Sequence, residues 1–375
     1  MPALLNPLDP DGLLEYSVVY TDRSLNHMSQ SFQTVMNEIS TALKEVYNAR
    51  STVIVPGSGT FAMEAVARQF ATGKNCLVIR NGWFSYRWSQ IFEMGTIPAK
   101  ETVIKARAVS SAAQSAFAPA PIAEVVAAIL AEKPDVVFAP HVETSAGIIL
   151  PDDYIRAVTE AVHSVGGIFV LDCIASGTIW VDMKACGVDV LISAPQKGWS
   201  GPPCAGLVML SELARDRIDS TTSSSFSCDL RKWLQIMETY ENGGHAYHAT
   251  MPTDSLARFR DVIYETGEFG FMKACSKQQE LGDRVRALLQ TKGVKSVAAP
   301  GFTAPGVIVS YTTDKEIQTG KKFMMEGVQI AAGVPLKCDE PADFQTFRIG
   351  LFGLDKLMDL DRTIAQLDAA LSHIF

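Results

Sequence analysis

Short apolar runs that alternate with segments of helical periodicity dominate the sequence. Apolar residues recur at helical spacing over residues 31–48, 124–131 and 152–164. The apolar runs lie at residues 53–55, 76–79, 135–139, 168–171, 190–193 and 205–210. Such runs, bounded by turn residues, are typical of strands buried on both faces. The alternation therefore predicts an α/β fold, in which helices cover both sides of a mostly parallel, mixed sheet.

The chain length predicts more than one domain. A chain of 375 residues is too long for one small core and suits a large domain with a smaller one. A long helical region spans about residues 252–292, with a bend expected near Gly267 and Gly270. Short strands and helices follow it, at residues 307–311, 315–326, 346–349 and 356–372. We predict an N-terminal arm at residues 1–24, a large domain at residues 25–260 and a small α+β domain at residues 261–375.

Charge and cysteine content exclude several classes of protein. The net charge of −8 argues against a surface for nucleic acids or anionic membranes. No apolar run approaches the roughly 18 residues that a membrane helix requires. Residues 1–20 carry no basic side chain, which is unlike a signal peptide. The seven cysteines are scattered and never spaced as C-x-x-C, so we expect free thiols in a reducing cytoplasm.

Two charged residues follow two of the apolar runs. Asp172 ends the run at residues 168–171, and Lys197 lies just beyond the run at residues 190–193. The gap of 197 − 172 = 25 positions fits one strand end, a crossover and the next strand end. Ligands of open α/β sheets bind at the carboxyl ends of strands. An acid for a pyridine nitrogen and an amine for an aldehyde are what an enzyme using pyridoxal 5′-phosphate (PLP) needs. Alternatively, Asp172 caps a turn and Lys197 is solvated.

A Gly-rich turn lies between the run at residues 53–55 and a predicted helix at residues 61–70. Its sequence is Gly57-Ser58-Gly59-Thr60. Glycines let the backbone approach an anion, and a helix N-terminus offers free N–H groups. The turn matches neither a Walker A loop nor G-x-G-x-x-G. Phosphate binding and a plain turn capped by Ser or Thr both remain open.

Two further polar positions are candidates for a site. Arg348 lies within an apolar strand, where it needs an anion. A substrate carboxylate would fit its planar fork, and an internal salt bridge is the alternative. His141 and Glu143 also follow a strand, but a third ligand at a usual spacing is missing, so we predict no metal site.

In combination, these motifs resemble those of the class V aminotransferases of PLP fold type I. The resemblance covers roughly residues 25–375 and is strongest to the alanine–glyoxylate and serine–glyoxylate transaminases. It rests on Gly57-Ser58-Gly59-Thr60 with Met63-Glu64-Ala65, Asn81-Gly82 with Arg87-Trp88, His141-x-Glu143-Thr144-x-x-Gly147, Asp172-x-x-x-Ser176, Gln196-Lys197 with Pro202-Pro203, and Phe347-Arg348-Ile349-Gly350.

The resemblance implies a role for each matching residue. Lys197 looks like the Schiff-base lysine, which also moves a proton, and Asp172 looks like the partner of the pyridine nitrogen. Arg348 resembles the arginine that binds the substrate carboxylate. The remaining cofactor residues implied are Ser58, Gly59, Thr60, Phe84 (or Trp83) stacked on the ring, Thr144, Ser176, Gln196, and Tyr247 with Thr250 from the other subunit of a homodimer.

The implied function is a cytoplasmic transaminase that works by a ping-pong mechanism. It would move an amino group from alanine or serine to glyoxylate or pyruvate. The family's usual opening Gly-Pro-Gly-Pro segment is replaced here by residues 15–23, and residues 225–230 look more like 2-aminoethylphosphonate–pyruvate transaminases. Two rival functions also stay open: a cysteine desulfurase-type lyase, with Cys338 as its best candidate, and a non-enzymatic PLP-binding protein.

Overall fold

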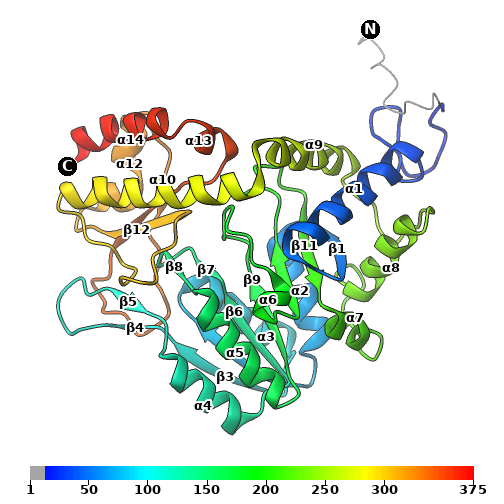
Figure 1. The fold of residues 1–375 in the computed structure, drawn as a ribbon, viewed down its shortest axis with the longest axis horizontal. Coiled ribbons are helices and arrows are strands. Elements are labelled where there is room, and N and C mark those ends of the chain that lie inside the picture. The colour runs from blue at the N-terminus through cyan, green and yellow to red at the C-terminus, as the bar shows by residue number, and fades with distance from the viewer. Residues whose placement is uncertain (1–12) are drawn as a thin grey trace.

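A seven-stranded sheet forms the centre of the molecule in the computed structural model, which describes residues 13–375 (Figure 1). Residues 1–12 of the predicted arm lie outside the described residues. In spatial order the strands are β1 (Ser51–Pro56), β11 (Ala205–Leu210), β10 (Val190–Ser193), β9 (Ile168–Asp172), β6 (Val136–Pro140), β2 (Asn75–Arg80) and β3 (Lys100–Lys105). Pairing is parallel from β10 to β3, whereas β11 is antiparallel to both β10 and β1. The predicted α/β fold with a mostly parallel, mixed sheet is confirmed.

The strand register brings the carboxyl ends of the central strands together. Asp172, the last residue of β9, pairs with Ile192 of β10 and with Pro140 of β6. Every residue of β6, β9, β10 and β11 is buried, because helices cover the sheet on both faces. Polar residues that follow these strands are therefore delivered to one edge of the sheet.

Helices α4 and α5 lie on one side of the sheet, and α2 and α3 lie on the other (Figure 1). Helix α1 begins at Gln30, where the Ser29 hydroxyl caps the Phe32 N–H, and it ends before Asn48, which is left-handed. The helices up to residue 241 are α1 (Gln30–Tyr47), α2 (Gly59–Phe70), α3 (Trp83–Gly95), α4 (Ile122–Glu132), α5 (Asp152–Ser164), α6 (Met183–Cys186), α7 (Glu212–Ile218) and α8 (Leu230–Glu241).

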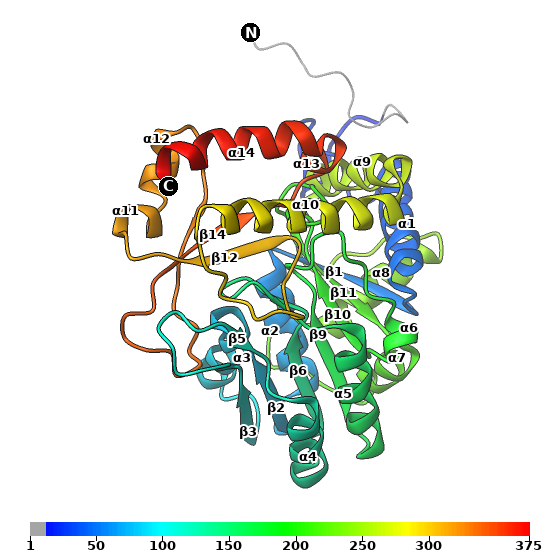
Figure 2. The same cartoon turned by 60° about the vertical axis from the view of Figure 1, so that its left-hand side comes forward.

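A second, three-stranded sheet lies beneath α10 and α14, which run side by side (Figure 2). Its order is β12 (Val307–Tyr311), β14 (Thr346–Gly350) and β13 (Ala331–Ala332). The later helices are α9 (Thr253–Phe269), α10 (Phe271–Thr291), α11 (Lys315–Gln318), α12 (Lys321–Met325), α13 (Leu354–Met358) and α14 (Leu360–Ile374). Two small hairpins pair β4 (Arg107–Ala108) with β5 (Phe117–Ala118) and β7 (Val142–Glu143) with β8 (Ile148–Ile149).

The structure differs from the sequence prediction in several elements. The long helical region breaks at Gly270, whose φ of 99° no helix accommodates, whereas Gly267 lies inside α9. The helix expected at residues 315–326 divides at the left-handed Gly320, and the one expected at residues 356–372 divides at Asp359, which caps α14. Strand β3 and helices α3 and α8 were not predicted.

The predicted division into residues 25–260 and 261–375 stays a prediction. Across residues 13–375, no helix combines the length and the apolar character needed to cross a membrane.

Candidate active site

Asp172 and Lys197 are presented by two loops that lie against each other. Asp172 ends β9, and Lys197 lies in the turn that follows β10. A Cβ at Gly198 would come within 1.9 Å of the Gly177 carbonyl oxygen, so only glycine lets the lysine loop approach the loop after Asp172. Ser200, next in this turn, accepts a hydrogen bond from the Leu354 N–H at 2.7 Å. The lysine is therefore fixed between the central sheet and the segment that follows β14.

The charges of Asp172 and Lys197 act on each other. Burial raises the pKa of Asp172 to about 6, although the Ile174 N–H and Lys197 oppose the shift. Burial also lowers the pKa of Lys197, helped by Arg348 and Arg87 and opposed by Asp172. The two groups do not form a direct ion pair. Both shifts bring the pKa values of the two groups closer to neutral pH, as is common for residues that react.

The Gly-rich turn forms a cradle beside Asp172. Gly57 has a φ of 124°, and a Cβ at Gly59 would come within 2.5 Å of the Ile174 side chain, two residues after Asp172. Ser58 is the N-cap of α2, yet its hydroxyl makes no capping hydrogen bond. The interpretation of a simple Ser cap is therefore wrong for Ser58. The N-terminus of α2 therefore has polar groups that an anion could bind.

Glu143 fixes the start of α3, which carries Phe84. Its carboxylate is fully buried and accepts hydrogen bonds from the backbone N–H groups of Phe84 and Ser85 and from both the N–H and the hydroxyl of Ser145. A carboxylate at a helix N-terminus is favoured by the helix dipole. The hydrogen bonds of Glu143 therefore hold the backbone of Phe84 in place.

Arg348, in β14, approaches the Phe84 ring from another segment of the chain. Its guanidinium carbon lies 5.4 Å from the centroid of the Phe84 ring, and its Nε donates to the Ala332 carbonyl at 2.8 Å. Burial lowers the pKa of Arg348, and Glu143 partly opposes this. No carboxylate of residues 13–375 forms a salt bridge with Arg348, so the internal salt bridge considered from the sequence is wrong within this range. Its charge remains available to an anionic ligand.

Three further predicted residues follow β6 and β9. They are His141, Thr144 and Ser176. Thr144 is 6% exposed, and its hydroxyl has no hydrogen-bond partner in residues 13–375. His141 Nδ1 lies 2.7 Å from the Ser176 hydroxyl, and burial lowers the pKa of His141 to about 4, so the ring is neutral. An orphaned buried hydroxyl needs a partner. Ser176 meets His141 rather than facing an open space.

Three predicted cofactor residues, Gln196, Tyr247 and Thr250, are exposed in the single chain. Gln196 is exposed beside Lys197. Tyr247 is 53% exposed, its hydroxyl lies 3.2 Å from that of Thr250, and its ring lies 5.5 Å from that of His27. Tyr247 therefore lies beside the N-terminal segment of the same chain, with Thr250 next to it.

Sequence reasoning missed Phe352, and it considered Glu143 only as a metal ligand. The Lys197 amine lies 5.8 Å from the centroid of the Phe352 ring. The sequence pattern that could have indicated Phe352 is its spacing from Arg348 and Gly350, because every second residue of an extended segment lies on the same face. Within residues 13–375, no group of His, Cys, Asp and Glu is arranged to hold a metal ion.

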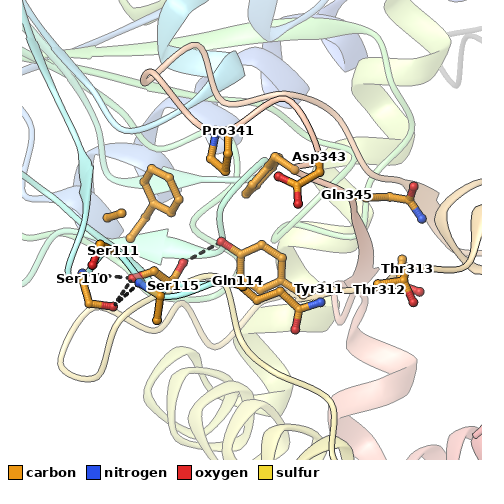
Figure 3. Close-up of a pocket in the computed structure, with 15 residues that line it drawn as sticks. Ser110, Ser111, Gln114, Ser115, Tyr311, Thr312, Thr313, Pro341, Asp343 and Gln345 are labelled. Atoms are coloured by element: carbon orange, nitrogen blue, oxygen red, sulfur yellow. Dashed lines mark hydrogen bonds between the residues drawn. The ribbon is translucent and has the colours of Figure 1, made fainter.

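A separate cavity of about 540 Å³ lies away from Lys197 (Figure 3). The loop between β4 and β5 and the segments at residues 311–313 and 341–345 line it. The Tyr311 hydroxyl donates a hydrogen bond to the Ser115 carbonyl at 2.6 Å, and the Thr312 N–H donates one to the Gln345 carbonyl at 3.0 Å, so the three segments are joined. None of the candidate site residues lines this cavity.

The side chains around Asp172 and Lys197 fit a PLP molecule. The unpaired Thr144 hydroxyl, the Gly59 cradle and the free Ser58 hydroxyl are what a ring with a hydroxyl and a phosphate requires. A buried acid stands at one side, and a half-buried amine stands at the other. Cys338, by contrast, is 4% exposed, and burial raises its thiol pKa to about 12, which makes it a poor nucleophile.

Comparison with known proteins gives a family match over most of the chain. The family model for "Aminotransferase class-V" matches residues 13–346. The alanine–glyoxylate aminotransferase of Callithrix jacchus is 28% identical over 360 residues, which cover 93% of this chain and 82% of that protein.

Solved structures share the fold. An alanine–glyoxylate aminotransferase from Nostoc sp. has a TM-score of 0.78 at 21% identity, covering 94% of this chain and 89% of that one. A ureidoglycine–glyoxylate aminotransferase from Bacillus subtilis has a TM-score of 0.76 at 20% identity, covering 93% and 87%.

Proposed function

The chain belongs to the class V aminotransferase family of PLP-dependent enzymes, and we propose that it moves an amino group from alanine or serine to glyoxylate or pyruvate. One observation carries the assignment of the site. Asp172 at the end of β9 and Lys197 after β10 are presented at the same edge of the sheet, near enough for each to affect the pKa of the other, and they make no direct ion pair. The buried Thr144 hydroxyl, which has no partner in residues 13–375, supports a ligand bound nearby.

The residues of the site divide the work between binding and proton transfer. PLP, when bound, supplies an aldehyde for the amino group and a ring that withdraws electrons from the substrate Cα. Lys197 would hold the aldehyde carbon, and its lowered pKa favours a role in carrying a proton between the substrate Cα and C4′ of the cofactor. Asp172, when ionised, would hold the proton on the ring nitrogen.

Binding of small substrates is supported by Arg348 and Phe352. Arg348 has no carboxylate partner in residues 13–375 and offers a planar fork to the carboxylate of an amino or 2-oxo acid. The Phe352 ring near the Lys197 amine restricts the space for a side chain. The relatives named alanine–glyoxylate aminotransferases support the same substrate size, at 28% identity.

We place the active enzyme in the cytoplasm as a homodimer in which Tyr247 and Thr250 reach the partner's cofactor. Their exposure, and that of Phe226 (77%) and of Phe61 (51%) beside the cradle, supports a covered face. A mixture of Lys197→Ala and Tyr247→Ala/Thr250→Ala chains tests the sharing. When sites are shared, each mixed dimer has one intact site of two, and about half of the dimers in an equal mixture are mixed, so the mixture should recover roughly a quarter of wild-type activity. No recovery, with mixed dimers present, would show that the sites are not shared.

The function is tested by visible absorbance of the purified protein with PLP and single amino acids. We expect an absorbance band that is lost in Lys197→Ala, conversion by L-alanine or L-serine, and restoration by glyoxylate or pyruvate. Conversion by 2-aminoethylphosphonate alone would transfer the assignment to that substrate class. The lack of any band with added PLP would overturn the assignment of Lys197.

A further inference from the structure

Arg87 of α3 links the Gly-rich cradle to the Phe84 ring. Its Nη1 donates a hydrogen bond to the Thr60 hydroxyl at 3.0 Å. Its guanidinium carbon lies 5.1 Å from the centroid of the Phe84 ring, one turn earlier on the same helix. One side chain therefore contacts the second residue of α2 and the aromatic ring of α3 at once.

The charge of Arg87 has no counterpart in the described part of the chain. Arg87 is half-buried and forms no salt bridge with any residue between 13 and 375, and its hydrogen bond to Thr60 is to a neutral group. Arg68, farther along α2, instead pairs with Glu64 at 2.7 Å. A partly buried guanidinium without an acid is costly unless an anion neutralises it.

Arg87 also lies near enough to Asp172 and Lys197 to affect both side chains electrostatically. Its positive charge contributes to lowering the pKa of Lys197 and acts in the same direction on Asp172. Arg348 is the other unpaired guanidinium near Phe84, and it extends from the opposite segment of the chain, in β14. Two guanidinium groups therefore lie near the Phe84 ring, that of Arg87 beside the cradle and that of Arg348 from β14.

We propose that Arg87 carries the positive charge that meets the phosphate of the cofactor, and that through Thr60 and Phe84 it fixes the phosphate relative to the ring. This rests on the proposed function, because it assumes that PLP binds beside Asp172 and Lys197. The phosphate would then lie at the start of α2, within reach of the free Ser58 hydroxyl and the Arg87 guanidinium. Arg348 is left for the substrate.

The test compares PLP with pyridoxal, which has the same ring and aldehyde and lacks the phosphate. Apo protein is titrated with each compound and binding is followed by absorbance, for wild type, Arg87→Gln and Arg87→Lys. We expect Arg87→Gln to weaken PLP binding by about 10- to 100-fold, as for a lost charge-assisted hydrogen bond, and to leave pyridoxal binding unchanged. Arg87→Lys should restore part of the loss, since it keeps the charge without the fork.

The matched control is Arg68→Gln, which removes the same charge from the neighbouring helix α2. Arg68 lies nine residues after Gly59, about 13.5 Å along α2, and we expect PLP binding to stay at the wild-type value. Melting of each apo variant with added inorganic phosphate gives a second measurement, and only variants that keep the charge at position 87 should be stabilised.

Three outcomes would overturn the role of Arg87. Equal losses for PLP and pyridoxal in Arg87→Gln would mean that Arg87 acts on the ring or on the fold. Unchanged PLP binding with a raised KM for the amino donor would assign Arg87 to an acidic group of the substrate. Unchanged PLP binding and unchanged donor KM would leave it without a ligand role. Failure of wild type to bind PLP would instead refute the proposed function.

Discussion

The two edges of the central sheet each bury an aspartate, and their surroundings are opposite. At the amino edge, Asp189 precedes β10, and its carboxylate accepts from the Phe169 N–H and from His163 Nε2 at 2.8 Å each, and from the Ser211 hydroxyl at 3.2 Å. At the carboxyl edge, the carboxylate of Asp172 accepts a single hydrogen bond, from the Ile174 N–H. Both are nearly inaccessible, at 2% and 7% exposure.

This difference separates a structural carboxylate from a functional one. Asp189 has its partners within the chain, so the chain alone explains why it is buried. Asp172 is left short of partners, and burial raises its pKa to about 6. A buried acid that the chain does not satisfy points to a ligand that does. Matched variants at the two edges test whether chemistry belongs to one and stability to the other.

The largest effect is expected from Lys197→Ala at the carboxyl edge. Loss of the amine removes both the attachment of the aldehyde and the proton carrier, so turnover should fall by at least about 10²- to 10⁴-fold. Lys184→Ala is the matched change at the amino edge, where Lys184 lines the cavity beside His163 and Asp189. Steady-state rates should remain at the wild-type value in that control. Comparable losses in both variants would remove the distinction between the edges.

Asp172→Asn should stabilise the apo protein while it lowers activity. A carboxyl whose folded pKa lies above its unfolded value of 3.8 binds more protons when folded, so stability falls as pH rises from about 4 to about 6. A shift to about 6 corresponds to about 3 kcal/mol at neutral pH. Urea unfolding of cofactor-free protein at pH 7 should therefore show a more stable Asp172→Asn variant. A less stable variant would show that the aspartate is satisfied within the chain.

The same substitution at the amino edge should have the opposite sign. In Asp189→Asn, an amide NH₂ replaces one oxygen that now accepts from the Phe169 N–H, His163 or Ser211. At least one donor then loses its acceptor, which costs about 1–3 kcal/mol. Urea unfolding provides the measurement, and activity of the remaining folded protein should be unchanged. Stabilisation by Asp189→Asn would contradict our assignment of a structural role.

Strand ends were the part of the site that the sequence could predict. The apolar runs before Asp172 and Lys197 were long and clear enough to place both residues at one edge of a parallel sheet. The break at Gly270 was predictable for a similar reason, because glycine is a common helix breaker. These inferences depend on local patterns, and the structure agrees with them.

Contacts between distant segments could not be predicted in the same way. Glu143 holds the start of α3 from 59 positions away from Phe84, and Arg87 reaches Thr60 from 27 positions away. Such pairs follow from how α2, α3 and the β7 hairpin pack on the sheet, which no local pattern encodes. Helix α3 itself was missed, since its buried residues are Ser85, Trp88, Ser89 and Phe92, in which serines interrupt the apolar stripe that would have indicated a helix.

The smallest effect is expected at His163, and its pH window separates the two edges. The hydrogen bond to Asp189 raises the pKa of His163, although burial and Arg217 oppose this. A raised folded pKa stabilises the protein fully below the unfolded value of 6.5, and this stabilisation is lost as pH rises through the folded pKa. The side chain is 38% exposed, so solvent screens the pair and we expect less than about 1 kcal/mol. Unfolding of wild type and His163→Gln at pH 6 and pH 8.5 should show this loss in wild type alone. A loss of equal size in both would assign it to other groups, such as Asp172, which both proteins retain.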